Sequence, residues 1–177
     1  MRVAFFTEMG FGGKVPRTHK NMRTEFAWMC ALDADHYAIS AIPNVTQEYD
    51  LAIIIIPKKL SESELGTGSI TGIRKFAKKV AVMQEGPYWY YQDYPVELQI
   101  QYYNLLHDAD IIYIHNETDR NYYQGMFEKD IRVMPTLMIE DSISNLRASE
   151  QNKNIIIGGN FVSWYGGFDS FNISRYI

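Results

Sequence analysis

The stretch Leu51-Ala52-Ile53-Ile54-Ile55-Ile56-Pro57 decides the fold of this chain. A run of β-branched side chains closed by a proline predicts a central β-strand, because such side chains pack well on both faces of a pleated sheet. Three other short apolar runs lead into glycine-containing or polar turns, at residues 3–7, 80–83 and 109–114. We expect each run to be a strand that is buried on both faces, as in a parallel sheet.

Segments with helical spacing of apolar residues separate these strands. We expect helices over residues 18–30, 69–79, 95–107 and 116–129, and further short strands at 36–42 and 131–135. Thr18 is the expected cap of the first helix, and Lys78 and Lys79 are expected near the C-terminus of the second, where the helix dipole favours cations. Strands that alternate with helices predict right-handed crossovers. The fold class is therefore α/β, a Rossmann-like parallel sheet with helices on both faces.

The end of the chain repeats the layout of its beginning. Residues 154–169, NIIIGGNFVSWYGGFD, have the strand, glycine turn and helix start with which residues 1–23 open. We predict an N-terminal domain at 1–138, a polar linker at 139–153 and the truncated start of a second Rossmann-like domain at 154–177. A strand without its sheet is expected to associate with another copy of the chain. The alternative is that residues 155–157 complete the sheet of the first domain.

The composition narrows the class of protein. The 177 residues are 46% hydrophobic and 21% charged, which suits one globular domain and leaves little chain for another. A net charge of −4 gives no general attraction to polyanions. The single Cys30 excludes an internal disulfide, and the chain has no metal-binding motif. The single cysteine suggests the reducing cytoplasm, and no apolar run approaches the roughly 18 residues of a membrane span, so we expect a soluble, cytoplasmic protein.

Ligands of an open parallel sheet bind beyond the carboxyl ends of its strands, so the strand-to-helix turns are the candidate site. The first turn is Gly10-Phe11-Gly12-Gly13-Lys14. It is either a mobile loop that tolerates unusual backbone angles or a phosphate site built from backbone amides and Lys14. Basic residues downstream would extend such a site: Arg17, His19, Lys20 and Arg23. The turn departs from the dinucleotide fingerprint at its third glycine, which disfavours a nicotinamide oxidoreductase.

The second turn, residues 84–94, has the sequence QEGPYWYYQDY. Its aromatic side chains, Trp89 among them, offer flat faces that stack on a sugar or a base, or they pack over the end of the sheet. Gln84 and Glu85 stand where a substrate hydroxyl would be contacted, although a glutamate at a strand end is often a cap.

The third turn is His115-Asn116-Glu117. His115 is a candidate proton acceptor or hydroxyl ligand, and a structural role is the alternative. Asn116 is well explained as the cap of the following helix, with Asp119 three residues on. His36 and His107 stand beside aspartates at the ends of elements and are expected to be structural.

Taken together, these features resemble the N-terminal lobe of a GT-B-fold glycosyltransferase. The resemblance is most specific in the strand at residues 3–7 with its glycine turn, in residues 110–116 and in the restart at 155–169. It implies transfer of a sugar from a nucleotide diphosphate donor, with a UDP-sugar expected, to an acceptor hydroxyl. This chain would be the acceptor-side lobe. It would be inactive alone, because the acidic motif that grips the donor lies far into the second lobe.

The resemblance also implies roles for individual residues. Glu85 or His115 would be the catalytic partner of the acceptor hydroxyl. Substrate contacts would come from Gly10, Gly12, Gly13, Lys14, Gln84, Trp89 and Asn116. Gly158, Gly159 and Asn160 take the place of the diphosphate-binding turn of the second lobe, without its customary cations.

A narrower similarity is to phage glucosyltransferases that modify hydroxymethylated cytosine, for which the acceptor would be a modified DNA base. Acceptors in small molecules or at the cell surface are equally open. The main alternative is a single-domain α/β module that binds or regulates without catalysis.

Overall fold

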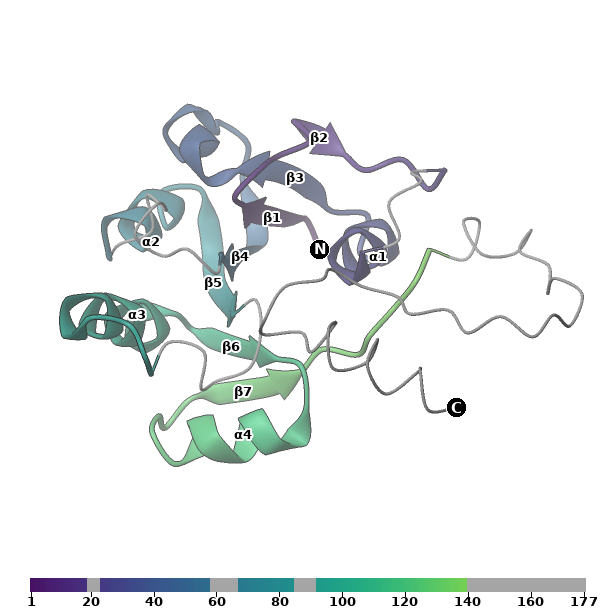
Figure 1. Cartoon of the computed structure of the whole chain (residues 1–177). Coiled ribbons are helices and arrows are strands. Elements are labelled where there is room, and N and C mark those ends of the chain that lie inside the picture. Colours follow the sequence, from purple (N-terminus) through teal and green to yellow (C-terminus); the bar gives the residue numbers. More distant parts are fainter. Residues whose placement is uncertain (19–22, 58–66, 85–91, 140–177) are drawn as a thin grey trace, which may run out of the picture. The chain divides into compact units, whose positions relative to one another are not determined.

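The structure is a computed structural model that describes residues 1–18, 23–57, 67–84 and 92–139 (Figure 1). All of these residues belong to one compact unit, Met1–Asn145. The predicted second domain at 154–177, and nearly all of the predicted linker, lie outside the described residues.

The described part of the chain forms one seven-stranded sheet in the order β2-β3-β1-β4-β5-β6-β7. Its strands are β1 (Val3–Thr7), β2 (Gly13–Lys14), β3 (Asp35–Ala38), β4 (Tyr49–Ile56), β5 (Ala77–Gln84), β6 (Ile111–Ile114) and β7 (Asp130–Val133). Every neighbouring pair is parallel except the edge pair β2 and β3, which is antiparallel. The predicted α/β fold with a mostly parallel sheet is confirmed.

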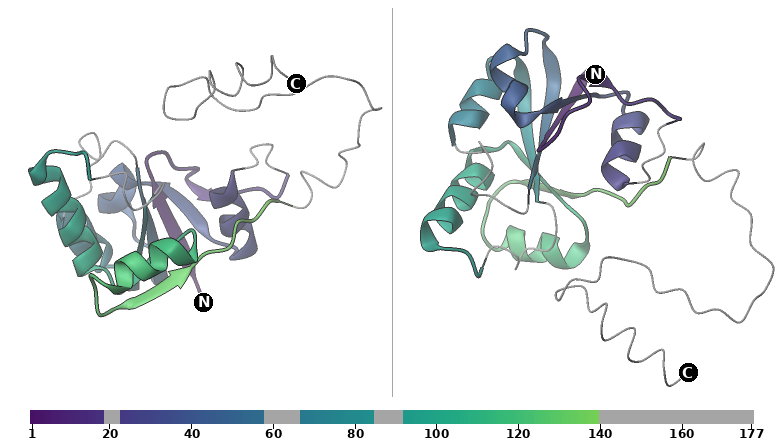
Figure 2. Two further views of the ribbon diagram at one scale, coloured as in Figure 1. Left: turned by 60° about the horizontal axis from the view of Figure 1, so that its bottom comes forward. Right: turned by 45° about the horizontal axis from the view of Figure 1, so that its top comes forward.

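Helices cover both faces of the sheet. They are α1 (Thr24–Ala31), α2 (Thr67–Ile73), α3 (Val96–Asp108), α4 (Glu117–Gln124) and a 3-10 helix, η1 (Ile39–Asn44). The chain leaves β1 toward one edge through α1, and it leaves β4 toward the other edge through α2, α3 and α4. Because right-handed crossovers in opposite directions fall on opposite faces, α1 lies across the sheet from α2 and α3 (Figure 2, right).

The core therefore has two halves, one on each face. Ile53 of β4 packs in the half that contains Trp28 and Met29 of α1. Its neighbour Ile54 points the other way, into the half that contains Ile73 and Leu105. Each of these side chains is almost completely buried, which stabilises the fold by about 1.5–3 kcal/mol per side chain. The isoleucine run is thus the central strand that its composition predicts.

The glycine turn begins as a loop at residues 10–12 and then enters a strand, and two of its glycines have the unusual backbone angles that one interpretation of the sequence expects. Gly12 and Gly13 have φ values of 80° and 152°, and the amide of Gly12 donates to the carbonyl of His36 over 2.9 Å. The chain then pairs with β3 as the edge strand β2. A Cβ at Gly10 would lie 1.9 Å from the backbone nitrogen of Ala38, so this close approach requires glycine.

Two predicted helix boundaries are also wrong. Helix α1 begins at Thr24, and the residue at its N-cap position is Arg23, whose side chain makes no capping hydrogen bond. Thr18 therefore does not cap this helix. Helix α2 ends at Ile73, and β5 already begins at Ala77, because Tyr49 of β4 pairs with Ala77. Lys78 and Lys79 therefore lie on a strand and not at a helix terminus.

Two further elements are shorter than predicted. The strand expected at 36–42 ends at Ala38, where η1 follows and places Ile39 and Ile42 in the core. The helix expected to reach residue 129 ends at Gln124, and Gly125 is its C-cap.

Candidate functional site

A cavity of about 190 Å³ lies at the carboxyl ends of the central strands. Its wall combines strand ends and the beginning of α1. The lining residues are Thr7 of β1, Glu8 and Met9 after β1, Ile55 of β4, Pro57 after β4, Met83 and Gln84 of β5, His115 after β6, Thr136 after β7, His36 of β3, and Arg23, Thr24, Glu25, Phe26 and Trp28 at α1.

The topology explains this position. The chain leaves β1 and the neighbouring β4 in opposite directions, so the loops that follow them separate and leave a crevice between the strand ends. Thr7 ends β1, and Pro57 follows β4 directly. The cavity therefore lies at the switch point of the sheet, where doubly wound folds bind their ligands.

His115 reaches this cavity in a defined tautomer. Its Nε2 atom lies 3.0 Å from the backbone carbonyl oxygen of Gln84. A carbonyl oxygen only accepts hydrogen bonds, so Nε2 carries the proton and, in the neutral ring, Nδ1 carries the lone pair. Nδ1 has no hydrogen-bond partner among the described residues. In its neutral form, His115 therefore has its acceptor atom at Nδ1.

Trp28 supports the ring of His115. The indole and the imidazole are stacked, and the indole Nε1 donates to the carbonyl oxygen of Pro135 over 2.6 Å. Trp28 itself is 4% exposed. The imidazole is therefore held at its Nε2 atom by β5 and on one face by α1.

His36 lines the same cavity but is buried. The hydroxyl of Thr7 donates its single proton to the carbonyl of Met9, so Oγ1 accepts from Nε2 of His36, 2.8 Å away. Burial lowers the pKa of His36, and its hydrogen bond with the Met9 backbone opposes that shift only in part. His36 packs edge-on against Phe26, which agrees with the structural role expected for it.

The charges at the cavity favour hydrogen-bond donors in a ligand. Arg23 is already engaged, because its Nε lies 2.5 Å from the carboxylate of Glu25. The carboxylate of Glu8 and the hydroxyls of Thr24 and Thr136 have no partner within the described part of the chain. The described wall therefore offers acceptors and hydroxyls but no unpaired cation.

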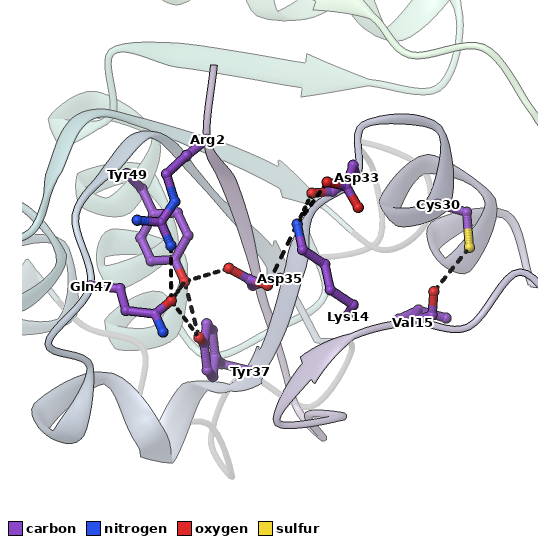
Figure 3. A network of polar contacts seen from close by, with 9 residues as sticks. All are labelled: Arg2, Lys14, Val15, Cys30, Asp33, Asp35, Tyr37, Gln47 and Tyr49. Carbon is purple, nitrogen blue, oxygen red and sulfur yellow. Dashed lines mark hydrogen bonds and ion pairs between the residues drawn. The ribbon is translucent and has the colours of Figure 1, made fainter.

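Lys14 lies elsewhere. It is on the edge strand β2, where its Nζ lies 3.1 Å from Asp33 and 3.7 Å from Asp35 (Figure 3). Asp35 also accepts from the hydroxyl of Tyr49, at the amino ends of the strands. Gly10, Gly12 and Gly13 belong to the turn into β2. The structure therefore does not bring the predicted phosphate loop to the cavity.

Gln84 and Asn116 have structural contacts. The side-chain oxygen of Gln84 accepts from the hydroxyls of Tyr102 and Tyr123, while its backbone carbonyl holds His115. The side chain of Asn116 caps α4 by accepting from the amide of Asp119 over 2.9 Å, as predicted. Five other predicted site residues lie outside the described residues: Glu85, Trp89, Gly158, Gly159 and Asn160.

Reasoning from the sequence did not assign several lining residues to the site, among them Thr7, Glu8, Trp28 and Thr136. Thr7 ends the first strand and Glu8 follows it directly, so both stand where the strand-end argument places a site. Trp28 carries no such signal, because an aromatic residue on a helix face normally predicts packing. Thr136 lies beyond the last strand, in a segment without a motif.

Among the residues that the structure describes, there is no group of three metal-ligating side chains. Their helices are all too short or too polar to cross a membrane. Comparisons with protein-family models, with curated proteins and with solved structures found no match.

Proposed function

We propose that this domain is the acceptor-side lobe of a glycosyltransferase and that the cavity binds the acceptor hydroxyl. The observation that carries the proposal is the free Nδ1 atom of His115 at the switch point of the sheet. A fixed proton acceptor beside a small cavity is what the activation of a hydroxyl group requires.

The proposed reaction uses His115 as the general base. The acceptor oxygen forms a bond to the anomeric carbon of the sugar, and the bond from that carbon to the nucleoside diphosphate breaks. The leaving diphosphate takes the electron pair, and the hydroxyl proton moves to Nδ1 of His115. Trp28 and the carbonyl of Gln84 hold the ring, which reduces the entropic cost of bringing the groups together.

The phosphates of the donor are assigned to a second lobe. Arg23 is paired with Glu25, and Lys14 is paired at the opposite edge of the sheet. The proposed donor contacts are therefore Gly158, Gly159 and Asn160, which the sequence places at the start of that lobe, and the donor is a UDP-sugar.

The test is the transfer of a labelled sugar from UDP-sugars to hydroxyl-bearing acceptors, including hydroxymethylated DNA. The 177-residue chain and any longer product of its reading frame are assayed, each with and without His115→Gln. We expect a loss of about 10²–10⁴-fold in kcat in the variant of the active form, as for the removal of a general base. Equal activity with His115→Gln would show that His115 is not the base.

A second candidate function is a binding module without catalysis. The observation in its favour is that the described wall of the cavity has no unpaired cation for a leaving phosphate. Ligand binding at the cavity, with no transfer by any form of the protein, would support this candidate.

A further inference from the structure

We propose that the cavity selects an uncharged, hydroxyl-rich ring of about one monosaccharide in size, and that Glu8 is the residue that recognises it. This inference deepens the proposed function, on which it rests for the role of His115. It distinguishes among the acceptor classes that the sequence leaves open, because a ligand that carries a phosphate is disfavoured in this cavity.

The size of the cavity sets the first limit. Its volume of about 190 Å³ is below the range of roughly 300–1,000 Å³ that is typical of sites for drug-sized ligands. A cavity of this size favours a single ring over a nucleotide.

The hydrogen-bonding groups set the second limit. Glu8 offers only acceptors when it is ionised, and neutral His115 offers an acceptor at Nδ1. Thr24 and Thr136 add hydroxyls that accept or donate. A ligand that satisfies these groups carries several donors, and the hydroxyls of a sugar or polyol supply them.

The charge at the start of α1 sets the third limit. A helix N-terminus attracts anions, but Glu25 already places a carboxylate in the first turn of α1 and binds Arg23. A phosphate that entered the cavity would share it with the unpaired carboxylate of Glu8, and this like-charge contact is unfavourable. The ligand is therefore neutral where it enters.

Apolar surface completes the match. Phe26 and Trp28 contribute aromatic surface to the cavity wall, and Met9, which is 77% exposed, lies at its rim. Aromatic rings pack against the C–H face of a sugar while the hydroxyls point to the polar groups.

The experiment is a titration followed by ¹H–¹⁵N NMR on the full chain, with four probes: D-glucose, methyl glucoside, glucose 6-phosphate and inorganic phosphate. We expect the two neutral sugars to shift the amides of Thr7, Glu8 and His115. Glucose 6-phosphate is expected to bind at least tenfold more weakly than glucose. Equal or tighter binding of glucose 6-phosphate, or no shift with either neutral sugar, would overturn the proposal.

Three variants test which side chain recognises the sugar. Glu8→Gln removes the charge of an exposed side chain and is expected to weaken glucose binding about tenfold, in line with the strength of a hydrogen bond to a charged group. Thr136→Val tests a second contact and should weaken binding less. Glu97→Gln, at an exposed position of α3, is the matched control and should bind as the wild type does. If Glu8→Gln binds glucose as tightly as the control does, Glu8 is not the recognition residue.

These outcomes also separate the two proposals. Glucose binding that depends on Glu8, without sugar transfer in any assay, would support the proposed ligand class and contradict the proposed reaction. Sugar transfer that depends on His115 but goes only to phosphorylated acceptors would support the proposed reaction and contradict the proposed ligand class.

Discussion

The indole of Trp28 stacks on the imidazole of His115, with 6.2 Å between the ring centroids and 28° between the ring planes. Through the bond from its Nε1 to the carbonyl of Pro135, the same indole also ties α1 to the segment after β7. Three parts of the chain that are far apart in sequence therefore meet at His115. Its orientation depends on this stack and on the carbonyl of Gln84.

Replacing Trp28 should release the ring of His115. In the wild type, the Nε2 proton of His115 should give an imidazole N–H signal in the ¹H NMR spectrum that is protected from exchange with solvent. We expect Trp28→Phe to keep this signal, because an aromatic face remains, and Trp28→Leu to lose it. The loss of the buried ring should also destabilise Trp28→Leu by about 2–4 kcal/mol in urea unfolding.

The control for this prediction is Phe26→Leu. Phe26 lines the same cavity from the same helix, and its ring packs against His36. A protected His115 signal in Trp28→Leu, or its equal loss in Phe26→Leu, would contradict a specific role for Trp28.

The glycine turn should tolerate no side chain at Gly10. An alanine Cβ there would overlap the backbone of β3 at Ala38, and a flexible side chain cannot relieve the overlap because the obstacle is main chain. We expect Gly10→Ala to lower the free energy of unfolding by about 2–4 kcal/mol. Gly125→Ala is the control, because its nearest atom would lie 3.4 Å away and its φ is −72°. Equal stability of the two variants in urea would contradict this role of Gly10.

The sequence predicts the parallel sheet well because each strand is specified locally. The isoleucine run of β4 has no alternative that buries so many β-branched side chains, and the cap at Asn116 depends on residues three positions apart. Such features need no knowledge of the rest of the fold.

The course of the glycine turn could not be predicted in the same way. Glycines permit both a phosphate-binding loop and a turn into an edge strand, and local sequence does not separate the two. The choice depends on contacts with β3, where Asp35 and Asp33 attract Lys14. These aspartates are about twenty residues away in sequence, so their effect appears only in the folded chain.

Of the candidate site, the sequence predicts the edge of the sheet and His115. It does not predict that Trp28 orients His115, because Trp28 comes from helix α1 and is itself held by the carbonyl of Pro135 after β7. It also does not predict that the side chain of Gln84 is engaged by tyrosines of α3 and α4. Tertiary contacts determine both the orientation of His115 and the hydrogen bonds of Gln84.

His36 should make the stability of the fold sensitive to weak acid. Burial lowers its pKa from the ordinary 6.5, so between the folded and the unfolded pKa the unfolded chain binds the proton more strongly. Stability should therefore be constant above about pH 6.5 and fall as the pH drops below that value. Urea unfolding at pH 7.5 and pH 5 measures the difference, and we expect it to be smaller in His36→Gln. An unchanged difference would show that other groups cause the acid sensitivity.

Asp110 should contribute stability that depends on its charge. Burial raises its pKa, but hydrogen bonds from the amide of Val80 and from Arg74, at 2.8 and 2.9 Å, outweigh that effect and hold the pKa below its usual value. A carboxyl group with a lowered folded pKa stabilises the fold above the unfolded pKa, about 3.9, and loses this contribution as the pH falls through the folded pKa.

We therefore expect Asp110→Asn to lower the free energy of unfolding by about 1–2 kcal/mol at pH 7, because the ion pair with Arg74 is partly exposed and contributes little beyond the hydrogen bonds. The difference from the wild type should shrink at pH 3. Asp93→Asn, at an exposed position with no partner among the described residues, should change stability by less than about 0.5 kcal/mol at either pH. A difference between wild type and Asp110→Asn that stays constant from pH 7 to pH 3 would show that the shape of the side chain matters and its charge does not.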